Sequence, residues 1–189
     1  MDELLTAQRE KYVVVLHEAL KKAQLANPNT HTEAMLAMTG GDFENLPYTF
    51  QKYVVDILRI KPDGSYGVEE INLDSQLDNH THFFDRGLMK ISISPFYWNG
   101  CLITLDRAPN DWEVYYSWIE KWFDHLQTAK SKEGLSGLIH NSTFPQKVEA
   151  NWEFSLDLGS SSIDALNELF DLMSGQGILN LKISSENHY

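Results

Sequence analysis

The sequence contains one cysteine, Cys101, so no internal disulfide can form. No apolar run reaches the length of about 18 residues that a membrane-spanning helix needs. The first residues also lack the basic start, apolar centre and small-residue cleavage site of a signal peptide. We therefore expect a cytoplasmic protein without a membrane span.

Basic residues are scarce in the last two thirds of the chain. The whole sequence has 15 lysines and arginines against 27 aspartates and glutamates, a formal net charge of −12. Residues 62–189 hold 8 of the basic and 19 of the acidic side chains, so nearly all of the excess lies there. Such a field repels nucleic-acid phosphates and favours a basic partner, although net charge also simply keeps a protein in solution. We expect no nucleic-acid partner.

Several motifs of enzymes are missing as well. The patterns GxGxxG, GxSxG and HExxH do not occur. The run Leu158–Ser162 precedes a predicted helix but lacks the GxxxxGK[ST] pattern and a nearby lysine, so helix capping is favoured over phosphate binding. Apolar residues follow Cys101, which favours a buried, unreactive thiol, and the sequence offers no identifiable partner for His17 or His140. The chain therefore favours a protein that is not an enzyme and has no cofactor.

Length and composition predict one α+β domain over residues 1–189, with 42% hydrophobic residues. Four helices are predicted, three of them from side-chain pattern or capping and the short one at 32–38 from the pair Gly40-Gly41 that ends it. These predicted helices are residues 2–26, 32–38, 111–127 and a segment from Ser161 or Ser162 to Met173. Strand-like patterns occur at residues 53–60, 66–73, 88–98, 101–106, 136–141, 151–158 and 178–184.

Turn residues connect these strands into two predicted hairpins. Pro62-Asp63-Gly64-Ser65 favours a reversal between strands 53–60 and 66–73. Asn99-Gly100 tolerates the positive φ of a type I′ turn and is predicted to join the strands on either side of it. From residue 101 onward, the order is the β-α-β-β-α-β order of a ferredoxin-like sandwich. We expect a largely antiparallel sheet with that order in the C-terminal half, extended by the hairpin 53–73, with an N-terminal helix at one end.

The segment DNHTHFFD, residues 78–85, raises the possibility of a metal site. On a strand, His80 and His82 would point to the same side, and Asp78 and Asp85 could add oxygen ligands. The usual zinc-ligand spacings are absent, however, and two alternating histidines arise easily by chance. A solvated loop is the favoured interpretation, and a metal-dependent enzyme using His80 and His82 remains the alternative.

A stronger signal is the combination of acids and aromatic rings between residues 69 and 98. The segment from Glu69 to Asp85 has five acids and no lysine or arginine. Charge can steer a partner while buried rings supply the retained binding energy. The opposing interpretation places the rings in the core and the acids on an ordinary wet surface. The predicted partner-binding residues are Glu69, Glu70, Asp74, Asp78, Asp85, Phe83, Phe84, Tyr97 and Trp98.

These observations lead to a non-enzymatic, acidic, cytoplasmic protein-binding domain as the functional hypothesis. By analogy, such a domain suits an inhibitor of the immunity or antitoxin type that masks a basic toxin such as a nuclease. A small-ligand or regulatory module that uses the sheet face is a further alternative. The sequence does not determine the oligomeric state.

Overall fold

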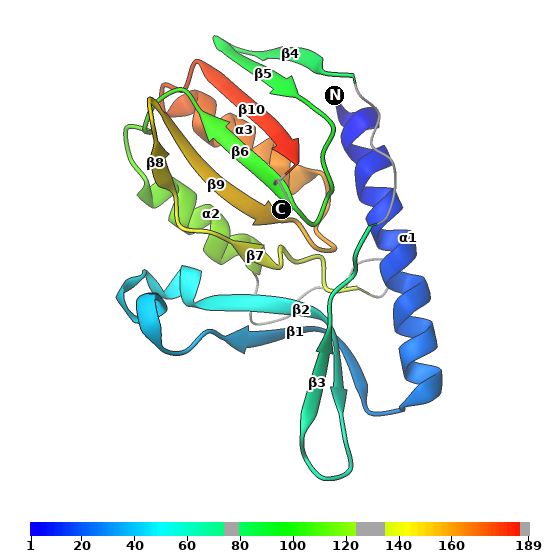
Figure 1. Cartoon of the computed structure of the whole chain (residues 1–189). Helices are drawn as coiled ribbons and strands as arrows, with labels where there is room; N and C mark the ends of the chain where they lie inside the picture. The colour runs from blue at the N-terminus through cyan, green and yellow to red at the C-terminus, as the bar shows by residue number, and fades with distance from the viewer. Residues whose placement is uncertain (74–79, 124–134, 186–189) are drawn as a thin grey trace.

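The computed structural model describes residues 1–73, 80–123 and 135–185, which form two β-sheets and three α-helices. A seven-stranded sheet has the order β4-β5-β10-β6-β9-β7, with β8 paired to β9, and a separate three-stranded sheet has the order β1-β2-β3 (Figure 1). The α+β class is confirmed. None of the helices among the described residues combines the length and apolar character needed to cross a membrane.

From residue 101 onward, the seven-stranded sheet follows the predicted β-α-β-β-α-β order with one additional short strand, Gln146–Val148, and the predicted strand 136–141 is reduced to Asn141–Ser142. Its strands are β4 (His82–Arg86), β5 (Met89–Ile93), β6 (Cys101–Leu105), β7 (Asn141–Ser142), β8 (Gln146–Val148), β9 (Asn151–Asp157) and β10 (Asn180–Ser185). The neighbours β10-β6-β9-β7 pair antiparallel throughout, whereas β5 joins the outer side of β10 in parallel. The ferredoxin-like part of the prediction therefore holds in the C-terminal half.

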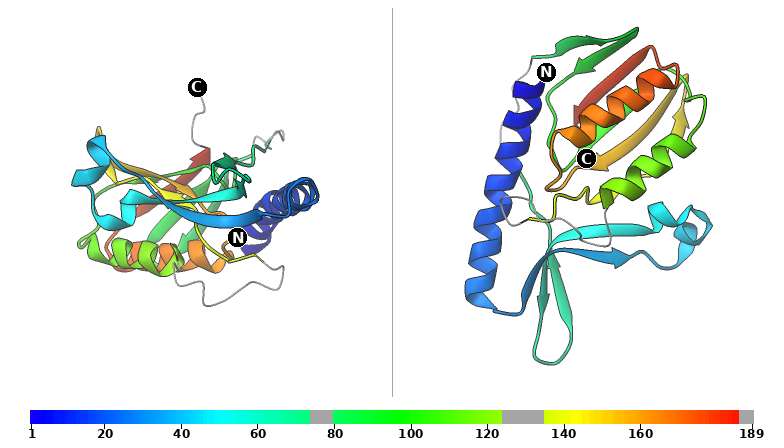
Figure 2. Two further views of the ribbon diagram at one scale, coloured as in Figure 1. Left: turned by 90° about the horizontal axis from the view of Figure 1, so that it is seen from below. Right: turned by 180° about the vertical axis from the view of Figure 1, so that it is seen from behind.

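Two helices cover one face of this sheet, α2 (Glu113–Phe123) and α3 (Asp164–Gly175) (Figure 2). Both helices are amphipathic, and alternate residues of β5, β6, β9 and β10 are buried beneath them. The opposite face of the sheet carries no helix among the described residues (Figure 2). The buried side chains of the helix-covered layer include Ile91, Ile93, Ile103, Leu105, Tyr115, Trp118, Phe154, Leu166, Phe170 and Ile183.

The three-stranded sheet is built from β1 (Thr30–Ala37), β2 (Lys52–Ile60) and β3 (Tyr66–Glu69). Two short 3₁₀ helices, Gly41–Asn45 and Tyr48–Gln51, connect β1 to β2. Helix α1 (Asp2–Ala26) runs along the side of both sheets (Figures 1 and 2). The predicted N-terminal helix and the predicted hairpin around Gly64 are confirmed.

Two strand pairings differ from the prediction. Strands β5 and β6 do not form a hairpin, because β10 lies between them in the sheet. The chain does reverse here, with the amide of Gly100 donating to the carbonyl of Tyr97 at 3.1 Å. The central residues are Trp98 and Asn99, however, and neither Asn99 nor Gly100 has the positive φ of the predicted type I′ turn. The strands diverge beyond this reversal, so a local turn does not fix the strand pairing that follows. The hairpin of β2 and β3 likewise belongs to its own sheet instead of extending the larger one.

Residues 32–38 form most of β1 and not the predicted short helix. Their antiparallel ladder with β2 runs from the pair Thr30–Arg59 to the pair Ala37–Lys52. The alanines and methionines of this segment have good intrinsic helix propensity, which made the helix prediction reasonable. A long tertiary ladder overrides such a weak local preference.

Candidate functional site

Residues 82–86 form strand β4 in an antiparallel ladder with β5, and not the predicted solvated loop. This strand brings together three of the predicted partner-binding residues, Phe83, Phe84 and Asp85. In the antiparallel ladder with β5, Phe83 lies opposite Ser92 and Asp85 opposite Lys90, while Phe84 lies opposite the buried Ile91. Phe84 therefore points to the helix-covered face and packs against the core. Phe83 points to the open face, and 78% of its surface is exposed.

The backbone N–H and C=O groups of Phe83 and Asp85 point away from the rest of the sheet. The amide of Lys90 donates to the carbonyl of Leu179, just before β10, and that of Ser94 donates to the carbonyl of Ile183 in β10. Ile91 and Ile93 therefore turn their backbone groups toward β4, where they lie opposite Phe84 and His82. Because backbone groups alternate sides along a strand, those of Phe83 and Asp85 point to the outer edge of β4. Among the described residues, no strand pairs with this edge. The result is an open site for an additional strand, next to an exposed ring.

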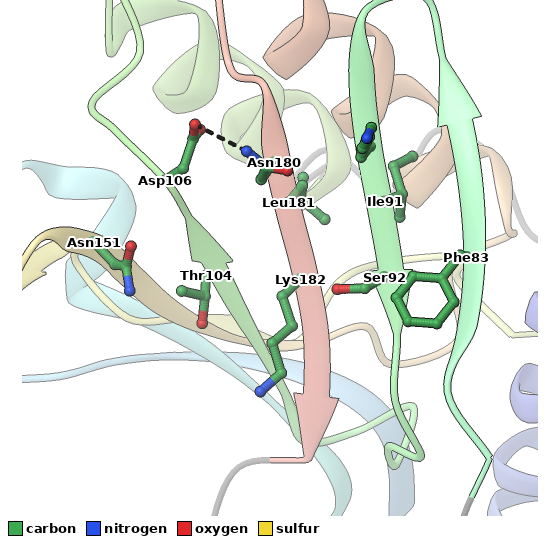
Figure 3. Close-up of a pocket in the computed structure, with 10 residues that line it drawn as sticks. Phe83, Ile91, Ser92, Thr104, Asp106, Asn151, Asn180, Leu181 and Lys182 are labelled. Atoms are coloured by element: carbon green, nitrogen blue, oxygen red, sulfur yellow. Dashed lines mark hydrogen bonds between the residues drawn. The ribbon is translucent and has the colours of Figure 1, made fainter.

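A shallow groove of about 340 Å³ lies on the open sheet face beside Phe83 (Figure 3). Lys90 and Lys182 both line this groove. Asp106 accepts a hydrogen bond from Asn180 at 3.3 Å (Figure 3). Asp85 lies directly across from Lys90. The groove thus contains charges of both signs and is not uniformly acidic.

The other predicted residues lie elsewhere. Trp98 is fully buried, and its indole donates to the carbonyl of Gly159 at 3.0 Å, so its assignment to a partner-binding surface is wrong. The ring finds a hydrogen-bond partner and apolar neighbours inside the protein, which explains its burial. Tyr97 is partly buried. Glu69 forms an ion pair with Arg59 on the neighbouring strand β2.

Glu70 follows β3 and lines a different cleft, together with Asn141 and Asp157. Asp74 and Asp78 lie outside the described residues. The seven predicted residues that the structure describes are therefore distributed over an exposed edge, core positions, an ion pair on the smaller sheet and a separate cleft. The charged and aromatic residues that do lie together on an open surface are Phe83 and Asp85 of β4.

The histidines of the DNHTHFFD segment do not form a recognisable metal site. His82 lies opposite Ile93 in β4, and its ring stacks on Phe84 at 6.4 Å between centroids. His80 is exposed just before the strand. Within residues 1–73, 80–123 and 135–185, no group of three or more histidine, cysteine or acidic side chains has the geometry of a metal site.

The most unusual polar arrangement is centred on His140, for which the sequence offered no partner. Its imidazole is fully buried between two carboxylates: Nε2 lies 3.1 Å from Glu33 Oε1, and Nδ1 lies 3.0 Å from Asp56 Oδ1. Glu33 and Asp56 lie opposite each other on β1 and β2, flanked by the pairs Thr32–Ile57 and Ala34–Val55. A cation between two facing carboxylates relieves the repulsion that such a pair would otherwise cause.

Further hydrogen bonds complete this cluster, which we call the His140 junction (Tyr12, Glu33, Asp56, His140, Asp157 and Ser160). Tyr12 of α1 donates to Asp56, and the amide of Ile71 donates to its second oxygen at 2.6 Å. The hydroxyl of Ser160 and the amide of Ser136 both donate to Glu33. Tyr12, Glu33, Asp56, His140 and Ser160 are each buried to within 1% of completely. These bonds satisfy charged groups that burial would otherwise make very costly.

Two residues at the His140 junction, Gly159 and Glu33, have a positive φ that fits their contacts with His140. Gly159 has a φ of 50°, and a Cβ at this position would lie 2.2 Å from Cδ2 of His140, so glycine allows the backbone to pack directly on the imidazole. Glu33 has a φ of 52°, which is uncommon for a residue other than glycine. Strained backbone of this kind persists only where the surroundings enforce it. Here the hydrogen bonds to the Glu33 carboxylate supply that restraint.

The electrostatics favour a charged histidine. Burial lowers the pKa of His140, but its hydrogen bonds to Asp56 and Glu33 and the nearby carboxylates raise it well above 6.5 overall. Burial raises the pKa of Asp56 and of Glu33, whereas hydrogen bonding and charge attraction from His140 more than offset this and lower both. The junction is therefore an imidazolium held by two carboxylates.

Asp157 behaves differently, although it belongs to the same cluster. Burial raises the pKa of its carboxyl to about 7, and the negative charge of Asp56 adds to the rise. Asp157 also lines a cleft of about 210 Å³ together with Glu70 and Asn141. A carboxyl that titrates near neutral pH in a cleft is a feature common at functional sites. His140 itself does not reach this cleft, because its side chain is fully buried.

Sequence reasoning missed the His140 junction because its members have no common motif. Glu33 lies 107 positions from His140 and 127 positions from Ser160. The available signals were Asp56 within an otherwise apolar strand and the histidine next to the run Leu138–Ile139. Each of these alone indicates a buried polar residue, but neither identifies its partner.

Comparisons of the chain with models of protein families, with curated proteins and with solved structures found no match.

Proposed function

We propose that this chain is a non-enzymatic protein-binding domain that binds a basic protein through the outer edge of β4. The observation that carries the proposal is Phe83, a large ring with 78% of its surface exposed on an edge strand. Exposed aromatic residues are frequent binding hot spots. The backbone groups of Phe83 and Asp85 offer hydrogen bonds to an added strand in the same place.

The charge of the chain supports a cationic partner. A net charge of −12 repels other acidic proteins, including a second copy of this chain, and attracts a basic one over a distance of about 10 Å or less in physiological salt. Asp85 lies at the binding edge itself, and Lys90 lies opposite it. The partner class that we propose is a basic toxin such as a nuclease, with this chain as its immunity- or antitoxin-type inhibitor.

The test is a pull-down from the source cell at low salt, with wild-type protein and the variants Phe83→Ala and Asp85→Lys. We expect a reproducible cationic protein whose affinity falls more than tenfold for Phe83→Ala, because truncating a hot-spot ring costs about 2 kcal/mol or more. The matched control is Glu18→Lys, which makes the same charge change at an exposed position of α1. A partner whose binding is unchanged by the β4 variants, or equally weakened by Glu18→Lys, would contradict the proposed site.

The inhibitor hypothesis needs its own measurement on the captured partner. If that partner is a nuclease, its activity should fall to background at one equivalent of wild-type chain. The Phe83→Ala variant should require a correspondingly higher concentration. A partner that keeps full activity in the complex would leave a binding protein but refute an inhibitor.

A small-ligand module on the same sheet face is the second candidate. The groove beside Phe83 has a volume of about 340 Å³, which lies near the lower end of the range for small-molecule sites. Lys90 and Lys182 together with the ring of Phe83 suit a small aromatic anion. Calorimetric titration with benzoate would detect such binding, and Lys182→Gln should abolish it. No heat change at millimolar benzoate would reject this candidate.

A further inference from the structure

The two sheets are joined at the His140 junction by segments distant in sequence. Glu33 and Asp56 belong to the three-stranded sheet and Tyr12 to α1, whereas Asp157 is the last residue of β9 in the seven-stranded sheet. His140 links them, because its carbonyl accepts from the amide of Val54 at 2.7 Å and its amide donates to the carbonyl of Asp157 at 2.8 Å. The junction is thus the point at which the chain's two layers share buried charges.

Helix α1 is attached to the same region. The Arg9 guanidinium donates to the carbonyls of Ser161 at 2.6 Å and Ser160 at 3.0 Å, next to the hydroxyl of Ser160 that binds Glu33. Tyr12 lies one turn further along the helix and reaches Asp56. The charged or titratable groups around the imidazole therefore come from every neighbouring element: Arg9, Tyr12, Glu33, Asp56, Glu70 and Asp157.

We propose that the His140 junction is a proton-dependent lock, which holds α1 and the three-stranded sheet against the seven-stranded sheet and opens in acid before the larger sheet unfolds. The larger sheet is stabilised by an apolar layer under α2 and α3, which contains no comparable charged cluster among the described residues. Apolar burial does not depend on proton concentration, whereas an ion pair does. Partial opening at the charged boundary is therefore the expected response to acid.

The direction of the pH dependence follows from the groups involved. The pKa values of Glu33 and Asp56 are lowered on folding, so their contribution is present above their ordinary values and lost as pH falls through the lowered ones. The raised pKa of Asp157, about 7, acts in the opposite sense: its contribution is complete in acid and lost as pH rises toward 7. His140 holds its proton throughout this range, because its pKa is raised. The lock should be tightest in weakly acidic solution.

The test is hydrogen exchange with mass spectrometry on the full chain, with protection factors corrected for the intrinsic effect of pH. In the Asp157→Asn variant, which lacks the opposing contribution of Asp157, we expect protection in α1, β1 and β2 to fall by at least about tenfold between about pH 5.5 and about pH 3.5, the effect of one pKa unit. Protection in β5, β6 and β10 should change by less than about twofold over the same interval. Simultaneous loss in both sheets, or no loss in α1, β1 and β2, would overturn the proposal.

Two variants keep the test independent of a failure to fold. Asp157→Asn imitates the protonated carboxyl and can still accept the bond that Gly159 donates to Asp157 at 2.8 Å. It should remove the decline in protection between about pH 4 and about pH 7 that we expect for the wild type. The exposed control Asp164→Asn should leave that decline unchanged. Equal behaviour of the two variants would refute the assigned role of Asp157.

Discussion

Tyr12 and Tyr115 are both completely buried, yet they belong to regions stabilised by different interactions. Tyr115 lies in an aromatic cluster, 4.5 Å from Phe154 between ring centroids, and its hydroxyl is 2.7 Å from that of Ser142. Tyr12 donates instead to a buried carboxylate of the His140 junction. Burial raises the pKa of both phenols, but only for Tyr12 do carboxylates add to the rise.

The apolar layer and the His140 junction should differ in how well they tolerate substitutions. An apolar layer loses stability in proportion to the atoms removed, and neighbours can partly collapse into the space. A buried ionic cluster is less tolerant, because the removal of one member leaves another charge without compensation. Substitutions of similar size should therefore have larger and more pH-dependent effects at the His140 junction than in the layer between the seven-stranded sheet and its helices.

The largest effect should come from His140→Ala at neutral pH. This change leaves the facing carboxylates of Glu33 and Asp56 buried without a cation, and breaking a buried ion pair in this way costs about 3–5 kcal/mol. Urea unfolding followed by circular dichroism would measure the loss. The control is His31→Ala, at an exposed position of β1, the strand that contains Glu33. This change should alter the unfolding free energy by about 0.5 kcal/mol or less. Equal losses would contradict an ionic junction.

Gly159→Ala should have the next largest effect. The new methyl would meet the His140 ring at 2.2 Å, and overpacking of a buried site typically costs about 1–3 kcal/mol. Gly137→Ala is the matched control, because Gly137 also has a positive φ, 74°, but nothing lies within 4 Å of the place that its new methyl would take. The difference in unfolding free energy between the two variants isolates the contact. A difference near zero would show that the loop adjusts without strain.

Replacing each buried tyrosine with phenylalanine compares the two regions directly. Tyr12→Phe removes a bond to a charged group and should cost about 1.5–3 kcal/mol, whereas Tyr115→Phe removes a neutral bond and should cost about 0.5–1.5 kcal/mol. Thermal and urea unfolding at pH about 6 would measure both. The difference should shrink in acid as Asp56 is protonated. A larger loss of unfolding free energy for Tyr115→Phe than for Tyr12→Phe would contradict the stronger bond that we expect at Asp56.

The smallest effect on stability is expected for Phe83→Ala. The ring is largely exposed on β4, so its removal should change the unfolding free energy by no more than about 0.5 kcal/mol. The same variant is expected to lose partner affinity, which would separate a binding role from a structural one. A large loss of stability would show that Phe83 stabilises the sheet, and it would weaken the proposed binding site.

Local sequence signals were reliable where the residues that determine an element lie within that element or next to it along the chain. The helical periodicity before Asn27-Pro28-Asn29 predicted α1, and the turn around Gly64 predicted the hairpin of β2 and β3. Most of the element order from Cys101 onward also follows from patterns that are each a few residues long, although the short strand β8 was not predicted. For the candidate site, the sequence singled out the aromatic and acidic residues Phe83 and Asp85 but predicted a solvated loop there instead of β4, and it could not separate the exposed Phe83 from the buried Trp98.

The sequence by itself determined the α+β class, the strongly acidic charge and the positions of most helices and strands, because each depends on composition or on neighbours along the chain. Tertiary structure alone decided that β10 separates β5 from β6, that residues 30–37 become a strand, and that His140 meets two carboxylates. The physical reason is that strand pairing and charge compensation are chosen among all segments of the chain at once. Glu33 acquires its partner 107 positions away only when both sheets and α1 are in place.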